Sequence, residues 1–198
     1  MADKYEYYNT GDDGYYPFHS TGWRAQTFTP ATAHKITSVK LLLYRSGSPG
    51  TVTVTIRATD VDSHPTGADL CSGTTNSNTL PTDSPFEWRE ITLGAGYNLA
   101  VSTKYAIVIR ATDGNDANYV MWRADTSSPA YTGGCFELSG NSGTTWASVT
   151  TYDQMFEEWG TIGGWANIAK VSGVASANIA KMNGVAVASI AKVNGVAV

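Results

Sequence analysis

The stretch Thr51-Val52-Thr53-Val54-Thr55-Ile56-Arg57-Ala58-Thr59 alternates apolar and polar side chains almost without a break. In an extended chain, successive side chains point to opposite faces, so the valines and the isoleucine share one face while the first three threonines and the arginine share the other. A strand of this kind buries one face and keeps the other in water, which is typical of antiparallel sheets. We therefore predict a half-buried strand of an all-β protein.

Comparable strands lie on both sides of this stretch. Six further segments are rich in β-forming residues and are separated by clusters of Gly, Pro, Asp, Asn and Ser: 24–29, 35–44, 86–93, 104–111, 118–124 and 154–159. No segment shows the periodicity of an amphipathic helix. Seven or more strands joined by such loops predict an antiparallel β-sandwich, specifically a jelly roll.

The composition excludes several classes of protein. A hydrophobic fraction of 42% is enough for a real core, and no run of apolar residues is long enough for membrane insertion. A net charge of −4 argues against a general nucleic-acid binder. The N-terminal residues lack the basic start and apolar run of a secretory signal peptide. We therefore expect either a chain that stays in the cytosol or one that leaves by a route without a signal peptide, such as release inside a virus particle by cell lysis.

The composition changes after Glu158, which is the last acidic residue. The charged residues that follow are Lys170, Lys181 and Lys192, so residues 1–158 carry −7 where the whole chain carries −4. Glycines at 160, 163 and 164 provide a flexible joint. We expect four parts: a Tyr-rich N-terminal arm (1–22), a jelly-roll sandwich (23–159), a glycine-rich joint (160–165) and a repeat tail (166–198).

The tail contains three repeats of 11 residues: ANIAKVSGVAS from Ala166, ANIAKMNGVAV from Ala177 and ASIAKVNGVAV from Ala188. Asn-Gly between apolar runs is a strong turn signal, because both residues tolerate a positive φ. Three such units hold too little apolar bulk to close a core alone. We predict that the tail forms β structure with other copies of the chain, as a trimeric stalk or a fibre; the alternative is a mobile end. The residues expected to make these contacts are Ile168, Lys170, Ile179, Lys181, Asn183, Gly184, Ile190, Lys192, Asn194 and Gly195.

Several segments of the body carry a resemblance to known domains: 25–30 (AQTFTP), 36–39 (ITSV), 49–57 (PGTVTVTIR), 65–67 (PTG), Trp88 and 104–108 (KYAIV). They resemble jelly-roll domains of bacterial surface proteins and phage structural proteins, which are similar in shape to carbohydrate-binding modules. The tail resembles C-terminal repeats of uncharacterised phage and environmental viral proteins. The resemblance, over residues 23–158, implies a display or adhesion protein, and the missing signal peptide suits the phage version.

The sequence holds no recognised catalytic motif. The histidines at 19, 34 and 64 lie in predicted loops, and no zinc-protease, nucleophile-elbow or phosphate-loop pattern is present. The acidic pairs Glu87/Glu90 and Glu157/Glu158 could serve a glycosidase, but sequence spacing does not set their distance in space. Carboxylates at solvated strand ends explain them as well. We therefore expect no enzyme activity and no cofactor.

Three loops contain pairs of aspartates that could bind calcium: 12 and 13, 60 and 62, and 113 and 116. None matches the EF-hand pattern, and aspartate is favoured in turns because its side chain bonds its own backbone. A calcium site is therefore the alternative to ordinary turns.

Aromatic side chains remain as candidates for ligand binding, because aromatic rings pack on the apolar faces of sugars. We select Tyr131, Trp122 and Trp146, with a place in the core as the alternative for each tryptophan. Five tyrosines fall within the first 16 residues, at 5, 7, 8, 15 and 16. An arm so rich in tyrosine indicates contact with another subunit or a ligand.

Cys71 and Cys135 fit no zinc or redox pattern. They can form a structural disulfide in an oxidising compartment or stay as two buried thiols.

These observations favour a non-enzymatic structural or adhesion protein, displayed on a phage particle or an extracellular surface and assembled through its tail. The expected partners are the chain itself, other virion proteins and cell-surface glycans, without nucleic acid. The alternative is a carbohydrate-binding module or a lectin-like surface protein.

Overall fold

The computed structural model describes residues 2–162 and, within the C-terminal repeats, the backbone of six two-residue strands. Residues 2–162 contain no α-helix, and the described residues include no helix with the length and apolar character needed to cross a bilayer. The elements of this part are β1 (Asp3–Tyr8), β2 (Gly14–Phe18), β3 (Trp23–Phe28), β4 (His34–Ser46), β5 (Thr51–Thr59), β6 (Pro65–Asn76), the 3₁₀ turn η1 (Ser77–Thr79), β7 (Glu87–Leu99), β8 (Tyr105–Arg110), β9 (Tyr119–Asp125), β10 (Phe136–Ser139), β11 (Ala147–Val149), β12 (Asp153–Gln154) and β13 (Phe156–Thr161).

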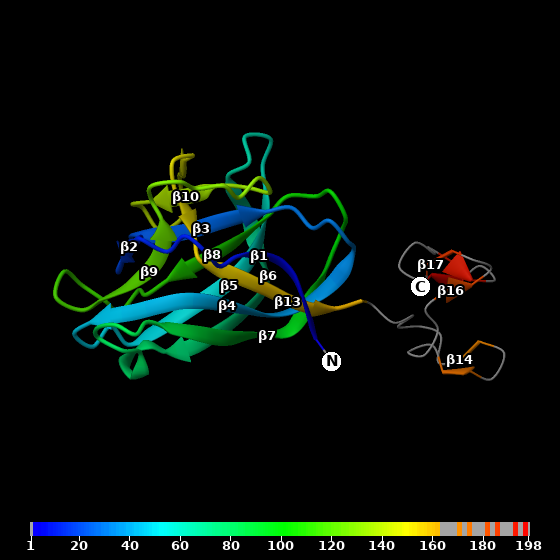
Figure 1. Ribbon diagram of the computed structural model, residues 1–198, viewed down its shortest axis with the longest axis horizontal. Helices are drawn as coiled ribbons and strands as arrows, with labels where there is room; N and C mark the ends of the chain where they lie inside the picture. The colour runs from blue at the N-terminus through cyan, green and yellow to red at the C-terminus, as the bar shows by residue number, and fades with distance from the viewer. Residues whose placement is uncertain are drawn as a thin grey trace.

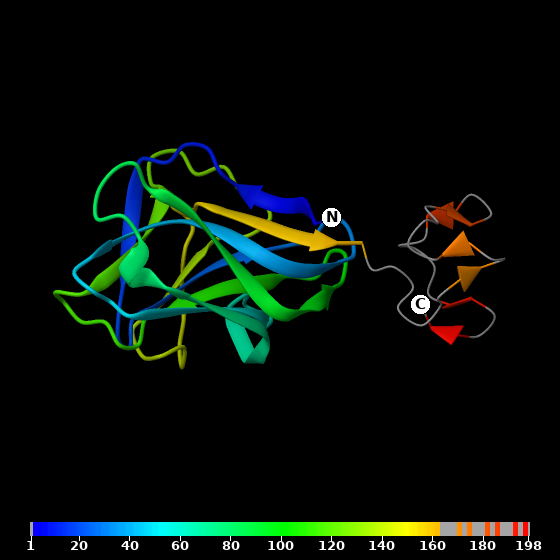
Figure 2. The same ribbon diagram turned by 90° about the horizontal axis from the view of Figure 1, so that it is seen from below.

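The strands form two antiparallel sheets that pack face to face (Figure 1 and Figure 2). The seven-stranded sheet has the order β1-β13-β4-β9-β12, with β7 paired to β4 and β2 paired to β9. The six-stranded sheet has the order β11-β10-β3-β8-β5-β6. All seven segments predicted from alternation are strands of these sheets, namely β3, β4, β5, β7, β8, β9 and β13. The predicted all-β antiparallel sandwich is confirmed.

The core lies between the two sheets and is formed by the apolar side chains that alternate with polar ones along the strands. Val52, Val54 and Ile56 of β5 are fully buried, as predicted, and share one cluster with Leu41 and Phe156 of the other sheet. Full burial of a side chain of this size contributes about 1.5–3 kcal/mol. The opposite face of β5 therefore forms part of the outer surface of the six-stranded sheet.

The N-terminal residues differ from the prediction of a separate arm. β1 pairs with β13 and β2 pairs with β9, so both belong to the seven-stranded sheet. Tyr5 stacks on His34 with ring centroids 3.7 Å apart, and the ring of Tyr16 lies 4.8 Å from that of Phe136. Tyrosine is enriched in strands because it fits a half-buried pleated surface. Packing within this chain thus accounts for most of the N-terminal tyrosines.

A buried ion pair fastens β1 to the sandwich. His34 Nε2 lies 2.7 Å from Glu158 Oε1, and neither side chain is exposed. His34 Nδ1 donates to the carbonyl oxygen of Thr32 at 2.7 Å, and the backbone N–H of Glu6 in β1 donates to Glu158 Oε2 at 3.5 Å. Glu158 points inward along β13, so the interpretation of it as a solvated carboxylate at a strand end is wrong.

Each C-terminal repeat contains one two-stranded antiparallel hairpin: β14 (Lys170–Val171) with β15 (Val174–Ala175), β16 (Lys181–Met182) with β17 (Val185–Ala186), and β18 (Lys192–Val193) with β19 (Val196–Ala197). The register is the same in all three, with each lysine opposite the alanine five residues later. The other predicted assembly residues lie outside the described residues: Ile168, Ile179, Asn183, Gly184, Ile190, Asn194 and Gly195. Pairing with other chains stays a prediction.

Candidate functional site

The outer face of the six-stranded sheet carries large polar and aromatic side chains. Ile109 of β8 lies in the core, so its neighbours Val108 and Arg110 point outward. The register places Val108 beside Ala25 of β3 and beside Thr55 of β5. Residues of β3, β8 and β5 that are far apart in the sequence therefore share one surface.

Trp23 lies within a cluster of charged side chains on this surface. The guanidinium carbon of Arg110 is 4.8 Å from the centroid of the Trp23 ring, and that of Arg57 is 5.4 Å away. Asp69 accepts from Arg57 Nε at 2.7 Å and from Arg110 Nη2 at 3.0 Å. Burial alone raises the pKa of Asp69, but the two guanidinium groups bring that pKa below its ordinary value. The carboxylate is therefore ionised at neutral pH and fixes both arginines beside the indole.

A second indole, Trp146, packs on the same face. Trp23 and Trp146 both contact a strip of small buried residues, Ala25, Ala106 and Val108. The loop that precedes Trp146 approaches closely at Gly143, which has φ +78°. A Cβ at this position would lie 2.8 Å from the Trp23 ring, so only glycine allows the loop to pass here without displacing the indole.

Several polar atoms of this face have no hydrogen-bond partner within the described protein. Of eight such buried atoms, four lie here: Nε1 of Trp23, Nε1 of Trp146, Oγ1 of Thr55 and Nη1 of Arg110. A buried polar group without a partner costs about 1–3 kcal/mol. A ligand rich in hydroxyl groups would supply partners for these atoms once the overlying side chains move.

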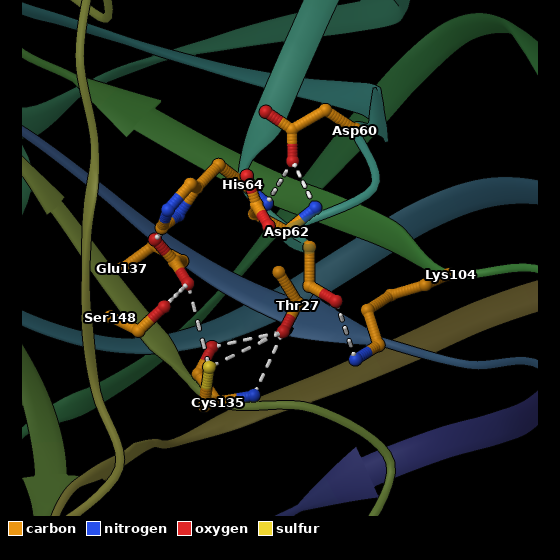
Figure 3. Close-up of polar contacts among 9 residues, drawn as sticks. Thr27, Asp60, Asp62, His64, Lys104, Cys135, Glu137 and Ser148 are labelled. Carbon is orange, nitrogen blue, oxygen red and sulfur yellow. Dashed lines mark hydrogen bonds and ion pairs between the residues drawn. The ribbon is translucent and has the colours of Figure 1, made fainter.

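Glu137 is buried on β10 beside this group and organises a polar cluster (Figure 3). Its carboxylate accepts from His64 Nδ1 at 2.8 Å, from the Ser148 hydroxyl, and from the Cys135 thiol at 3.5 Å. The bond from His64 to Glu137 raises the pKa of His64. Burial raises the pKa of the Cys135 thiol, and the nearby Glu137 raises it further. The thiol therefore keeps its proton at neutral pH, which disfavours a nucleophilic role.

His64 belongs to a loop separated from β10 by two strands, yet it contacts Glu137 on the same face of the sheet. It follows β5, which is separated from β10 by β8 and β3. The loop between β5 and β6 is held in shape by Asp60, whose Oδ1 accepts two backbone N–H groups of the loop, and by Lys104 Nζ, which donates to Ser63 Oγ at 3.1 Å. The bond from His64 to Glu137 places this loop over the outer face of the sheet (Figure 3).

The three aromatic candidates from the sequence occupy different environments. Trp146 lies on the outer face described above. Trp122 is fully buried and its Nε1 donates to the carbonyl oxygen of Met155 at 2.8 Å, so the prediction of Trp122 as a ligand residue is wrong. Tyr131 is half-buried: its hydroxyl donates to Glu6 Oε2 at 3.3 Å, and its ring packs edge-on against Phe156 with centroids 5.2 Å apart. Tyr131 contacts β1 and β13 and is not brought together with Trp146.

Cys71 and Cys135 are both free thiols. Cys71 lies on β6 at one edge of the six-stranded sheet, whereas Cys135 directly precedes β10 near the other edge. Four strand spacings amount to about 19 Å, far beyond the roughly 7 Å that a disulfide spans between Cα atoms. The disulfide alternative is therefore not realised within this chain.

Three of the aspartates considered for calcium, Asp12, Asp13 and Asp60, hold loops together. Asp12 Oδ1 accepts from Arg123 Nε at 2.8 Å, and Asp13 Oδ1 accepts from the Thr126 N–H at 2.7 Å. Among the described residues, no three His, Cys, Asp or Glu side chains are grouped closely enough to hold a metal ion.

Four residues of the outer face were not among the sequence candidates: Trp23, Arg57, Arg110 and Asp69. The alternation of β5 already directs Arg57 outward, and the alternation of β3 directs Trp23 outward. The neighbourhood of β3, β8 and β5 has no such local signal, because cross-strand pairing is decided by the whole fold.

Comparisons with known proteins place the fold. No known protein family and no curated protein matches this sequence. Among solved structures, the chain is similar to one described as the cysteine protease and lectin-like domains of Cwp84, a surface layer associated protein of Clostridium difficile, with a TM-score of 0.50 and 15% identity. The match covers 82% of this chain and 36% of that one, so this chain spans about a third of the length of that protein. At this identity the similarity concerns the fold alone: a β-sandwich of a kind found in a protein with a lectin-like domain.

Proposed function

We propose that this chain is a lectin-like surface protein that binds carbohydrate through the outer face of the six-stranded sheet. The observation that carries the proposal is the convergence of Trp23, Trp146 and the Arg57–Asp69–Arg110 network on one rigid surface. Indole rings pack against the apolar C–H faces of sugars, and fixed charged groups orient sugar hydroxyls. Trp23, Arg57, Arg110 and Asp69 lie on strands, which keep their geometry without ordering on binding, whereas Trp146 lies in the loop before β11.

The unpartnered atoms of Trp23, Trp146, Thr55 and Arg110 are buried in the free protein, and they support a polar ligand whose binding displaces the side chains above them. The fold similarity to a protein with a lectin-like domain supports the same class of ligand and an extracellular or surface location.

The test is a glycan array followed by calorimetric titration of the best ligand. Trp23→Ala and Trp146→Ala should each weaken binding by about tenfold or more, because a central aromatic contact is worth at least about 1.4 kcal/mol. Tyr15→Ala, which removes a half-exposed ring from β2, is the matched control and should leave affinity unchanged. Failure of the wild-type chain to bind any glycan, or equal binding by all variants, would overturn the proposal.

The tail supports a second role, in assembly. The three hairpins share one register and each starts at a lysine, so every repeat offers the same short strand pair for contact with another copy of the chain. In this role the sandwich is displayed on a virion or cell surface and the repeats join the subunits, as a closed oligomer or a fibre. Light scattering of the full chain and of a chain ending at Gly164 checks it. A monomeric full chain at about 10–100 μM, a range where an obligate assembly stays intact, would refute it.

A further inference from the structure

A separate group of aromatic and charged side chains lies on the opposite side of the sandwich, on the outer face of the seven-stranded sheet. Glu158 of β13 points into the core, so its neighbours Glu157 and Trp159 point outward. The register places Trp159 opposite Lys4 of β1 and Glu157 opposite Tyr7. Aromatic and charged positions therefore alternate across these two strands.

The group extends over two more strands. Glu157 is opposite Lys40 of β4, and Lys40 is opposite Glu90 of β7. The row Tyr7, Glu157, Lys40 and Glu90 thus crosses four adjacent strands, a span of about 14 Å. Trp88, two residues before Glu90 on β7, points to the same side. This surface is long enough to hold an extended chain laid across the strands.

Internal contacts hold the polar groups in place. Glu157 accepts from Lys4 Nζ at 3.2 Å, from Asn9 Nδ2 at 2.8 Å and from Trp159 Nε1 at 3.0 Å. Burial raises the pKa of Glu157, but these donors bring that pKa below its ordinary value. The carboxylate is ionised and the indole is fixed, so the surface is organised before any ligand arrives.

A lysine side chain lies against each of two aromatic rings of this surface. Tyr7 is 49% exposed, and Lys4 Nζ lies 4.2 Å from the centroid of its ring. Lys40 Nζ lies 4.5 Å from the centroid of the Trp159 ring. Lysine side chains are flexible and partly solvated, with about 30% of the side chain exposed in Lys4 and Lys40. A sugar ring can therefore displace Lys40 from the Trp159 ring, while Lys4 stays on Glu157 and keeps that carboxylate in place.

The charges define the class of ligand. Lys4 and Lys40 balance Glu157 and Glu90, so the surface is neutral overall, while residues 1–158 as a whole carry −7 and repel polyanions. The exposed Tyr7 ring and the partly buried Trp159 ring lie among hydrogen-bond donors and acceptors, and this arrangement matches a chain of uncharged sugar rings. We infer that this face is a second carbohydrate-binding site, one for neutral glycan chains. The inference rests on the proposed function for the class of ligand but uses none of the same residues.

Native gels cast with soluble polysaccharides test the inference on the full chain. The probes are a soluble β-glucan, a galactomannan and a xylan as neutral chains, and polygalacturonate as the acidic one. Tyr7→Ala combined with Trp159→Ala should weaken the retardation by at least one neutral probe about tenfold or more, and Trp159→Phe, which keeps an aromatic ring, should retain most of it. Polygalacturonate should retard none of the variants. Thermal unfolding of each variant shows whether the sandwich is intact. If the double variant is unstable, the single Tyr7→Ala variant tests the site instead, because the Tyr7 side chain is half exposed and its removal should not unfold the protein.

The outcomes separate the two sites. Two sites on one chain are supported if the Trp23→Ala, Trp146→Ala variant is still retarded by a neutral probe. That retardation should then disappear when Tyr7 and Trp159 are also replaced. Loss of all binding on replacing Trp23 and Trp146, with no effect of Tyr7→Ala or Trp159→Ala, overturns the second site and leaves the proposed function standing. Absence of any glycan binding by the wild-type chain overturns both.

Discussion

A single substitution in the buried pair of His34 and Glu158 tests whether this pair stabilises the fold. In Glu158→Gln the side chain keeps its shape and an oxygen that accepts from His34 Nε2, but it loses the negative charge. Both side chains of the pair are fully buried. Removing one partner of such a pair leaves the other without compensation and costs about 3–5 kcal/mol. For a protein of this size, we expect the melting temperature to fall by roughly 6–20 °C, at about 2–4 °C per kcal/mol.

The dependence of stability on pH tests the same reasoning independently. Burial alone lowers the pKa of His34, but the hydrogen bond and charge of Glu158, together with the carbonyl of Thr32, raise that pKa above its ordinary value. The stability contributed by protonated His34 is therefore fully present below about pH 6.5, the ordinary histidine value, and is lost as the pH rises through the raised value. In Glu158→Gln the part of this loss that comes from His34 should disappear, while the part that comes from His64, whose pKa is also raised, should remain.

Urea unfolding at a series of pH values, followed by far-UV circular dichroism, measures both effects. Lys4→Gln is the control, because it breaks the partly exposed contact with Glu157 on the same two strands and should cost less than about 1 kcal/mol. A loss below 1 kcal/mol in Glu158→Gln, or an unchanged pH profile, would refute the view that a buried charge pair fastens β1.

Three further predictions follow from the described contacts. Trp122→Ala should destabilise the sandwich by about 3–5 kcal/mol, since it empties a fully buried site, yet the folded fraction should bind glycan as the wild type does; a selective loss of affinity in calorimetry would contradict its core role. Intact mass should be the same before and after reduction, and Cys135 should react slowly with iodoacetamide at pH 7, because its raised pKa keeps it protonated; a 2 Da difference would restore the disulfide. His64→Ala should cost about 1–2 kcal/mol and speed amide exchange in residues 60–64, because buried Glu137 loses a hydrogen-bond donor. In the wild type the same loop should loosen as the pH rises through the raised pKa of His64. If the amide exchange rates of residues 60–64, corrected for the intrinsic effect of pH on exchange, do not change with pH, the role of His64 in holding the loop is contradicted.

The local pattern of residues was enough to determine the class of fold. Alternation in residues 51–59 identified β5 and its core-facing side, because the two-residue period of a strand is a property of the backbone itself. The opposite side, predicted to be solvated, is partly covered, and Thr55 on it is fully buried. The same period identified six other strands. The break in composition after Glu158 and the period of 11 residues are likewise visible without coordinates, and each repeat does contain a short antiparallel hairpin.

Tertiary structure decided which side chains meet. Trp122 and Trp23 are both tryptophans on strands, yet one is in the core and the other on a surface, because the pairing of β9 and β3 with their neighbours sets which face of each strand turns inward. Glu157 and Glu158 are adjacent in the sequence, but one anchors a surface network and the other a buried ion pair with His34. The N-terminal strands, the separation of the cysteines and both candidate sugar-binding faces depend on contacts between segments far apart in the chain. A local period cannot encode such contacts, since strand order and register are fixed by the packing of the whole sandwich.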